Sequence, residues 1–273
     1  MSTTSTRARR LIRRPGLALS VLFGLLVLAA LIRPSLLAGG DPLAGDLTER
    51  LTAPDGRHLF GTDHLGRDLF TRVVHGTRLS LGATGLAVAL GAVTGTAFGL
   101  AAGYAGGLVD SILSRLTDVL LAIPSLLLSL AIVAALGRGT VNIAVAVGVG
   151  SIAAFARLTR SEVIRVRTRE YVEAARAIGI GHLQIVARHV LPNSAGPVLA
   201  LVIVEFAMAI LSVAALSFLG YGAQPPAPEW GVLVAEGRDH LATSWWMTTL
   251  PGLTIVALVV SLNRIARAVQ GER

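Results

Sequence analysis

The side chains that could bind a metal gather in one polar segment of this chain. Three histidines and two aspartates occur there, at His58, Asp63, His64, Asp68 and His75. Imidazole and carboxylate groups suit nickel and similar divalent ions. Their spacing matches no compact set of metal ligands. We therefore expect ordinary loop and turn residues and no metal site, with a metal-entry site as the alternative.

The composition excludes most other site chemistry. The 273 residues contain no cysteine, which removes disulfides, zinc fingers, iron–sulfur clusters and thiol catalysis. All 24 basic residues are arginine, whereas a P-loop ATPase needs a lysine on the nucleotide phosphates. The chain is therefore not a Walker-type ATPase by itself. We find no nucleophile–base pair and no phosphate-binding loop, so we expect neither catalysis nor a cofactor.

The elements that carry these residues are apolar. Hydrophobic residues make up 53% of the chain, charged residues 15%, and the mean hydropathy is +0.69. A soluble domain carries roughly a quarter charged residues, so this composition indicates a membrane protein. The pI near 11.3 could suggest nucleic acid. The arginines flank long apolar runs and form no single basic face, so we expect no nucleic-acid binding.

Six apolar segments approach or reach the length of roughly 20 residues that crosses a bilayer. They are residues 17–32, 79–102, 116–136, 141–156, 198–219 and 246–262. We predict an all-α membrane protein with six transmembrane helices in a lipid bilayer. The first segment could instead be a signal peptide, but no small-x-small cleavage site precedes a polar mature start, so we expect a retained anchor.

Arginine counts predict the orientation, because cytoplasmic loops carry an excess of basic residues. With the N-terminus inside, the inner segments hold 16 arginines and the outer segments hold 8. We therefore expect both termini in the cytoplasm. The predicted organisation is a cytoplasmic tail 1–16, the first helix 17–32, an extracytoplasmic segment 33–78, a core 79–262 containing a cytoplasmic loop 157–197, and a tail 263–273.

The second apolar segment carries a glycine at every fourth position. These residues are Gly91, Gly95, Gly99 and Gly103. Such small-residue strips let another helix approach closely in a membrane. We therefore predict tight helix packing along this strip.

The long cytoplasmic loop contains the spacing of a short amphipathic helix. Tyr171, Ala174, Ala175 and Ile178 recur at positions that share one helical face. Gly179 can end such a helix in the left-handed conformation. From the pattern alone, the helix either rests on lipid headgroups or docks into the groove of a soluble partner.

The same loop resembles the EAA loop of permease subunits of ATP-binding-cassette (ABC) importers. The resemblance lies in Glu173-Ala174-Ala175, then Gly179, then Leu191-Pro192. In that family the loop forms the helix that docks onto the cytoplasmic ATPase. The resemblance implies an ATPase-docking site that comprises Glu170, Tyr171, Glu173, Ala174, Ala175, Ile178, Gly179, Leu191 and Pro192. We also expect Leu191-Pro192 to break the chain before the next apolar segment.

Four further motifs extend this resemblance over roughly residues 60–265. They lie at residues 61–68, 110–124, 215–220 and 224–231, with a helix entry at 78–81. Together they resemble the shorter, C-type permease subunit of dipeptide, oligopeptide and nickel importers. One position departs from the family, which often has a glutamate where this chain has Val213.

Two acids fall within the predicted spans, where an ionisable residue is a functional candidate. For Asp118 we expect a structural pair with Arg115 or with a neighbouring helix end. Glu205 either forms an internal hydrogen bond or lines a transport pathway. It does not simply replace the glutamate missing at Val213, because eight residues turn a helix by about 80° beyond two full turns.

The resemblance implies a type I ABC importer permease fold in a bacterial or archaeal inner membrane. The implied partners are a homologous second permease subunit, two cytoplasmic ABC ATPase subunits and an extracytoplasmic substrate-binding protein. Dipeptides or oligopeptides are the expected substrates, and nickel or another small solute is the alternative. A stand-alone secondary transporter is the rival hypothesis, and it would need Glu205 as its ion site. A membrane-anchored interaction protein is a second rival, although it would not need six spans.

Overall fold

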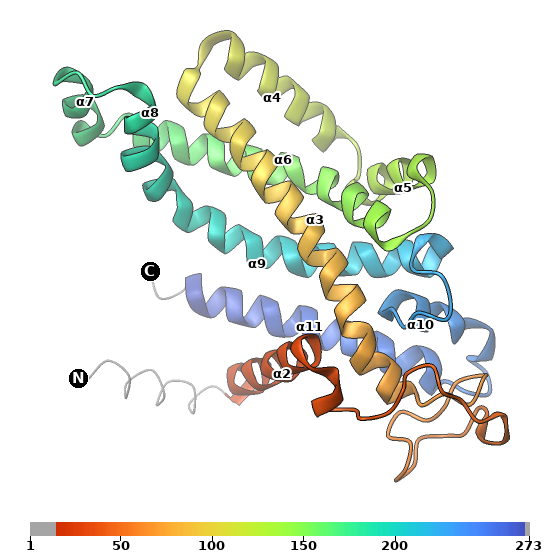
Figure 1. Ribbon diagram of the computed structural model, residues 1–273. Helices are drawn as coiled ribbons and strands as arrows, with labels where there is room; N and C mark the ends of the chain where they lie inside the picture. Colours follow the sequence, from red (N-terminus) through yellow and green to blue (C-terminus); the bar gives the residue numbers. More distant parts are fainter. Residues whose placement is uncertain (1–14, 271–273) are drawn as a thin grey trace, which may run out of the picture. The chain divides into compact units, whose positions relative to one another are not determined.

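The computed structural model describes residues 15–270, and helices dominate this part of the chain (Figure 1). Two isolated β-bridges, Gly45 to Arg67 and Thr62 to Asp68, are its β-type pairings. The all-α class predicted from the sequence is therefore confirmed. The arginines before Pro15 and the end of the C-terminal tail lie outside the described residues.

Within residues 15–270, five helical runs are long and apolar enough to cross a membrane. They are α2 (Pro15–Ile32), α3 (Leu69–Ala105), α6 (Thr140–Arg167), the run His182–Tyr221 and the greater part of α11 (Trp246–Gln270). A bent pair, α4 (Gly107–Ala122) and α5 (Ser125–Leu136), passes the same test together. The count reaches the predicted six when this pair is one span.

The third predicted span, residues 116–136, is not one straight helix. α4 and α5 meet at an angle of 92°, and Ile123 between them is extended. Pro124 explains the break, because the residue before a proline is disfavoured in the helical region and proline lacks an N–H for the helical ladder.

The chain does not break at Leu191-Pro192, so that expectation was wrong. α8 (His182–Ile185) continues through a π-helical segment, η3 (Val186–Val190), into α9 (Leu191–Leu216). The Leu191 N–H bonds to the carbonyl of Val186, five residues back. This wider π register accommodates the proline where a regular helix would clash with the carbonyl four residues earlier.

The described residues form two compact units. The first comprises residues 15–84, 137–143 and 210–270. In it, α2 packs along α11, and α10 (Trp230–Glu236) lies beside α11 and the π-helical segment η4 (Ser217–Tyr221). Its core is anchored by Trp230, whose indole N–H donates to the carbonyl of Val73 at 2.9 Å and whose backbone N–H donates to Ser80 Oγ at 3.0 Å.

The second unit comprises residues 85–136 and 144–209. The glycine strip of α3 faces α6 within this unit, as predicted from the spacing. A Cβ placed on Gly95 would lie 2.5 Å from the Ile152 carbonyl oxygen, and one on Gly99 would lie 2.4 Å from that of Ala156. The two backbones therefore meet at a distance that only glycine permits.

Candidate functional site

The motif-bearing loop forms a short helix, α7 (Glu170–Ala177), in the second unit. Glu170 and Glu173 lie in its first turn, where negative charge is favoured by the helix dipole. The helix is followed by Gly179, which has a φ of +82°. The prediction that Gly179 ends the helix in the left-handed conformation is confirmed.

One side of α7 is buried against the rest of the second unit. Val172 and Ala175 are 0% and 5% exposed. They belong to a buried apolar cluster with Val163, Val166, Ile185 and Val190. Ala175 is thus buried within this chain, although its spacing places it on the same helical face as the exposed Tyr171, Ala174 and Ile178. The inner side of α7 is formed by Ala175 and by the larger Val172, three residues before it.

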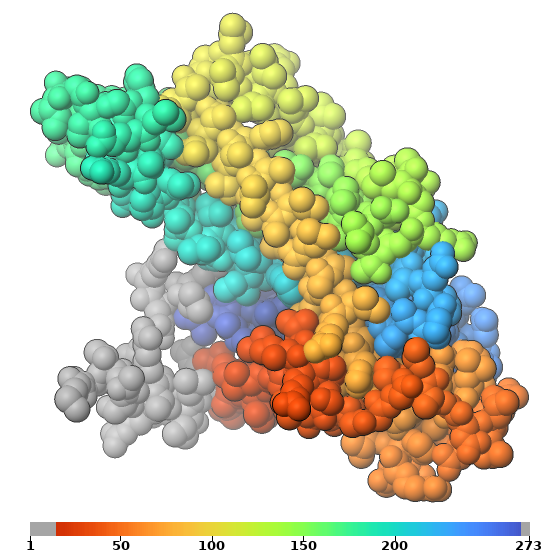
Figure 2. Space-filling view, in the orientation of Figure 1, coloured from red at the N-terminus to blue at the C-terminus, as the bar shows by residue number. Residues whose placement is uncertain are grey.

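The opposite side of α7 is exposed and carries apolar side chains. Ile178 is 77% exposed and Tyr171 is 45% exposed. We define the docking face as the exposed residues Glu170, Tyr171, Glu173, Ala174 and Ile178. The segment that bears it, drawn in teal, lies at the molecular surface in the view of Figure 2. Exposed apolar side chains on a fixed helix are typical of a surface that binds a partner.

The remaining predicted docking residues lie around this face. Gly179 directly follows it and is exposed. Leu191 and Pro192 are also exposed, in the first turn of α9. The rings of Tyr171 and His189 lie 6.1 Å apart, so the structure brings α7 next to η3, two residues before Leu191.

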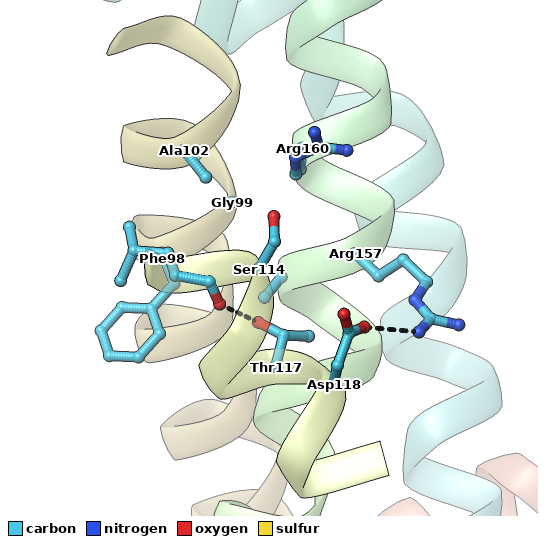
Figure 3. A pocket seen from close by; sticks show the side chains of 10 residues that line it. Phe98, Gly99, Ala102, Ser114, Thr117, Asp118, Arg157 and Arg160 are labelled. Atoms are coloured by element: carbon cyan, nitrogen blue, oxygen red, sulfur yellow. Dashed lines mark hydrogen bonds and ion pairs between the residues drawn. The ribbon is translucent and has the colours of Figure 1, made fainter. Parts of the chain in front are cut away.

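Asp118 does not pair with Arg115. Its carboxylate accepts a hydrogen bond of 3.2 Å from Arg157 of α6 (Figure 3). Both side chains are about two-thirds exposed, at 69% and 65%. Surface pairs of this kind contribute little, roughly 0–1 kcal/mol. Neither predicted partner, Arg115 or a helix end, is the one observed, because Arg157 lies within α6.

A cavity of about 200 Å³, with a lining that is part polar and part apolar, lies beside this pair in the second unit (Figure 3). Ser114, Thr117 and Asp118 of α4 line it opposite Arg157 and Arg160 of α6. The side chain of Arg160 is itself paired: its Nη2 donates to Asp110 at 2.7 Å. Both arginines of the cavity are thus neutralised by carboxylates of α4.

Glu205 lies on α9, is partly exposed, and has Ser151 of α6 as a polar neighbour. Its internal hydrogen bond and its place on a transport pathway stay predictions. Val213 is 1% exposed. The side chain that replaces the frequent family glutamate is thus packed inside the first unit, so it presents no polar group to a pathway.

The five metal-ligand candidates of residues 33–78 do not converge. His58 bonds to Asp68 at 2.8 Å and to Glu49 at 3.1 Å. His75 is separate, with its Nε2 3.2 Å from the carbonyl of Ala38. The hydrogen bond with Asp68 is the main reason why the pKa of His58 is raised.

Asp63 and His64 instead approach Glu236, with ligand atoms within 4.8 Å of one another. Two guanidinium groups form ion pairs with the carboxylates of Asp63 and Glu236. Arg67 and Arg72 each donate to Asp63 Oδ2 at 2.7 Å, and Arg72 donates to Glu236 at 2.6 Å. Burial opposes the shift, but backbone N–H donors and the arginines hold the pKa of Asp63 below its usual value. The cluster is an ion-pair network, in which a cation would compete with two arginines.

Glu229 and Glu236 are two buried or partly buried acids that were not predicted as site residues. Glu236 closes the ion-pair network from 164 residues away in the chain, and no local pattern marks it. Glu229 is 1% exposed and caps the N-terminus of α10 by accepting from the Gly231 N–H at 3.2 Å. Burial raises the pKa of Glu229, although the hydrogen bond from the Gly231 N–H opposes the shift. Residue type gave no signal for this cap, because the preferred N-cap residues are serine, threonine, aspartate and asparagine, and glutamate is not among them.

Residues 95–271 match the family described as the binding-protein-dependent transport system inner membrane component. The di/tripeptide transport system permease protein DppC of Pseudomonas aeruginosa is 43% identical over 207 residues, which are 76% of this chain and 68% of that protein. The dipeptide permease DppC of Alkalihalophilus pseudofirmus is 41% identical and covers 88% of this chain and 78% of that protein. The glutathione permease GsiD of Escherichia coli is 42% identical, over 77% of this chain and 69% of that protein.

Solved transporter structures share the fold. The MetNI methionine ABC transporter in an inward-facing conformation aligns with a TM-score of 0.56 at 22% identity, over 72% of this chain and 96% of that chain. An amino acid ABC transporter with histidines aligns with a TM-score of 0.57 at 16% identity, over 75% and 95%. The chain belongs to the binding-protein-dependent transport system inner membrane component family, and it is the permease subunit of an ABC importer.

Proposed function

We propose that this permease carries small peptides and is driven by a separate cytoplasmic ATPase that binds its docking face. The observation that carries the proposal is the division of α7 into two sides. Val172 and Ala175 fix the helix to the second unit, while Tyr171, Ala174 and Ile178 remain exposed. A helix that is packed on one side and presents exposed apolar and acidic side chains on the other suits insertion into a partner's groove.

Separate ATPase subunits are needed because this chain carries no lysine and therefore no Walker-type phosphate site. In the proposed assembly, two ATPase subunits lie on the cytoplasmic side, a homologous second permease completes the path, and a binding protein delivers substrate from outside. The excess of arginine in the segment that contains α7 supports a cytoplasmic location for the docking face and for both termini.

Peptides are the proposed substrates because relatives at 41–43% identity are named as di/tripeptide and dipeptide permeases. Nickel is the weaker alternative. In the structure, the outer histidines and aspartates that could have received the ion are spread over separate hydrogen bonds and ion pairs. Transport proceeds by alternating access: closure of the ATPase dimer displaces the docking face, and the permease halves reorient.

A pull-down of the tagged chain in mild detergent, followed by mass spectrometry, tests this assembly. We expect an ATPase and a second permease to be recovered with the wild-type chain. Glu173→Lys reverses a charge on the docking face and should abolish recovery of the ATPase without preventing membrane insertion. Asp239→Lys is the matched control, because it makes the same charge change at a side chain that is 77% exposed in the first unit.

Normal ATPase recovery and normal peptide uptake with Glu173→Lys would contradict the docking assignment. A wild-type chain recovered alone, yet active in ion-driven uptake, would support a secondary transporter instead. In that case Glu205 would be the first residue to replace.

A further inference from the structure

Tyr104, at the C-terminal end of α3, contacts the docking segment on both sides of the turn that follows α7. Its ring faces Arg176 of α7, whose Cζ lies 5.7 Å from the ring centroid. Its hydroxyl lies 3.0 Å from Nδ1 of His182, the first residue of α8. One side chain of α3 thus touches the chain before and after Gly179.

The backbone that carries Tyr104 is itself held in place. Arg167, the last residue of α6, donates from Nη1 to the carbonyls of Gly103 at 2.7 Å and Tyr104 at 3.1 Å. These carbonyls belong to the last turn of α3, where they have no partner within the helix and where a cation is favoured by the helix dipole. The ends of α3 and α6 are therefore joined at the point from which Tyr104 reaches α7.

Tyr104 adds orientation-dependent contacts to the apolar packing that holds α7 on the second unit. The buried cluster around Val172 and Ala175, against which Leu100 and Tyr104 pack, resists separation of α7 from the unit. The hydrophobic effect that buries this cluster is non-directional. The hydrogen bond to His182 and the placement of Arg176 over the ring depend on orientation, so they add directional contacts to α8 and to α7.

We propose that Tyr104 is a positioning residue that couples the docking segment to α3. When the ATPase displaces the docking face, the contacts of Tyr104 make α3 move with α7. Without them, α7 yields locally, and ATP is hydrolysed without a matching movement of the permease. This inference rests on the proposed function, because it requires that an ATPase acts on the docking face.

The test uses the complete transporter, with its second permease, ATPase subunits and binding protein, reconstituted in proteoliposomes. The measured quantity is the number of ATP molecules hydrolysed per labelled alanine dipeptide imported. Tyr104→Phe keeps the ring over Arg176 but removes the hydroxyl. Tyr104→Leu removes the ring as well. His182→Ala and the double variant Tyr104→Phe/His182→Ala complete a double-mutant cycle.

We expect ATPase recovery to stay normal in all variants while the ratio of ATP hydrolysed to peptide imported rises. For Tyr104→Leu the rise should be roughly fivefold or more, as expected from the loss of one hydrogen bond and one cation–π contact. Tyr104→Phe should show a smaller rise. The double variant should be no worse than either single change, because both remove the same hydrogen bond.

An unchanged ratio in Tyr104→Leu and Tyr104→Phe would overturn the inference. A loss of assembled transporter in both, with an unchanged ratio in what remains, would do the same, because it would show a purely structural role. If only Tyr104→Leu fails to assemble, the ratio in Tyr104→Phe decides the matter. Absence of ATP-driven import by the wild-type transporter would contradict the proposed function first, and the inference with it.

Discussion

Gly99 of α3 lies directly against Thr159 of α6, so that a Cβ placed on Gly99 would approach the Thr159 Cβ to 2.6 Å. The same atom would lie 2.4 Å from the backbone oxygen of Ala156. A backbone atom cannot move aside as a flexible side chain can. This helix pair of the second unit therefore depends on the absence of a single methyl group.

Gly99→Ala should destabilise the chain by about 1–3 kcal/mol, the usual cost of overpacking. The matched control is Gly85→Ala in the same helix, where a new Cβ would meet nothing within 4 Å. The control should be neutral or stabilising by about 0.5–1 kcal/mol, because alanine favours helix over glycine. Thermal unfolding in detergent, followed by tryptophan fluorescence, measures both. Equal unfolding midpoints for Gly99→Ala and Gly85→Ala would show that α3 and α6 separate readily enough to accept the added methyl group.

Arg72→Leu should cost about 3–5 kcal/mol, because it leaves the buried carboxylate of Asp63 with less compensating charge. The side chains of Arg72 and Asp63 are both 0% exposed. Arg57→Leu is the control, since Arg57 is 79% exposed in its pair with Glu49, and such a pair contributes roughly 0–1 kcal/mol. Chemical denaturation should show a much larger loss in the free energy of unfolding for Arg72→Leu than for Arg57→Leu. Comparable losses would mean that the ion-pair network contributes no more than a surface pair.

Glu229→Gln should make the stability of the chain less dependent on pH. The pKa of Glu229 is raised above its ordinary value of 4.5, so above that value the folded state retains a proton that the unfolded state releases. Stability contributed by this group therefore falls as the pH rises from 4.5 towards the folded pKa. Glutamine stays neutral and can still accept from the Gly231 N–H.

The variant should therefore gain stability relative to wild type as the pH rises through this window. Glu229→Ala is the comparison, since it loses the helix cap at a cost of about 0.5–2 kcal/mol. Unfolding midpoints at a series of pH values test the prediction. A constant difference between Glu229→Gln and wild type would show that Glu229 titrates normally.

His58→Gln should remove a pH-dependent stabilisation of the segment at residues 49–68. Because the pKa of His58 is raised from 6.5 by Asp68 and Glu49, its contribution is complete below 6.5 and is lost as the pH rises through the folded value. Hydrogen exchange of residues 49–68 should therefore quicken with rising pH more in wild type than in the variant, after correction for intrinsic exchange. Identical pH profiles would count against a charged His58.

The sequence predicted those features that follow from local periodicity. The four-residue glycine spacing predicted the close packing of α3 on a neighbouring helix, and Gly179 predicted the end of α7. Local spacing did not predict that Ala175 is buried while Tyr171, Ala174 and Ile178 are exposed, because it groups all four on one helical face. The tertiary partner decides which face is buried, and here the larger Val172 took the inner position.

The features that the sequence did not predict depend on residues far apart in the chain. Arg72 meets Glu236 across 164 positions, and Asp118 pairs with Arg157 instead of the nearby Arg115. The presence of a proline also did not predict whether a helix continues. The chain bends by 92° at Pro124, whereas Pro192 lies within a continuous helical run. The difference is the π-helical turn before Pro192, which has no marker in residue type alone.

The bend between α4 and α5 constrains how the permease is solvated. A helix end leaves carbonyl groups without partners, and in hydrocarbon each such group costs several kcal/mol. Residues 121–127 around Pro124 are exposed in the single chain. Whether the bent pair crosses the bilayer or re-enters it, these carbonyls require water or protein donors and not lipid tails. The bend therefore marks a wetted or protein-covered side of the permease, in contrast to the lipid-facing sides of its unbroken helices.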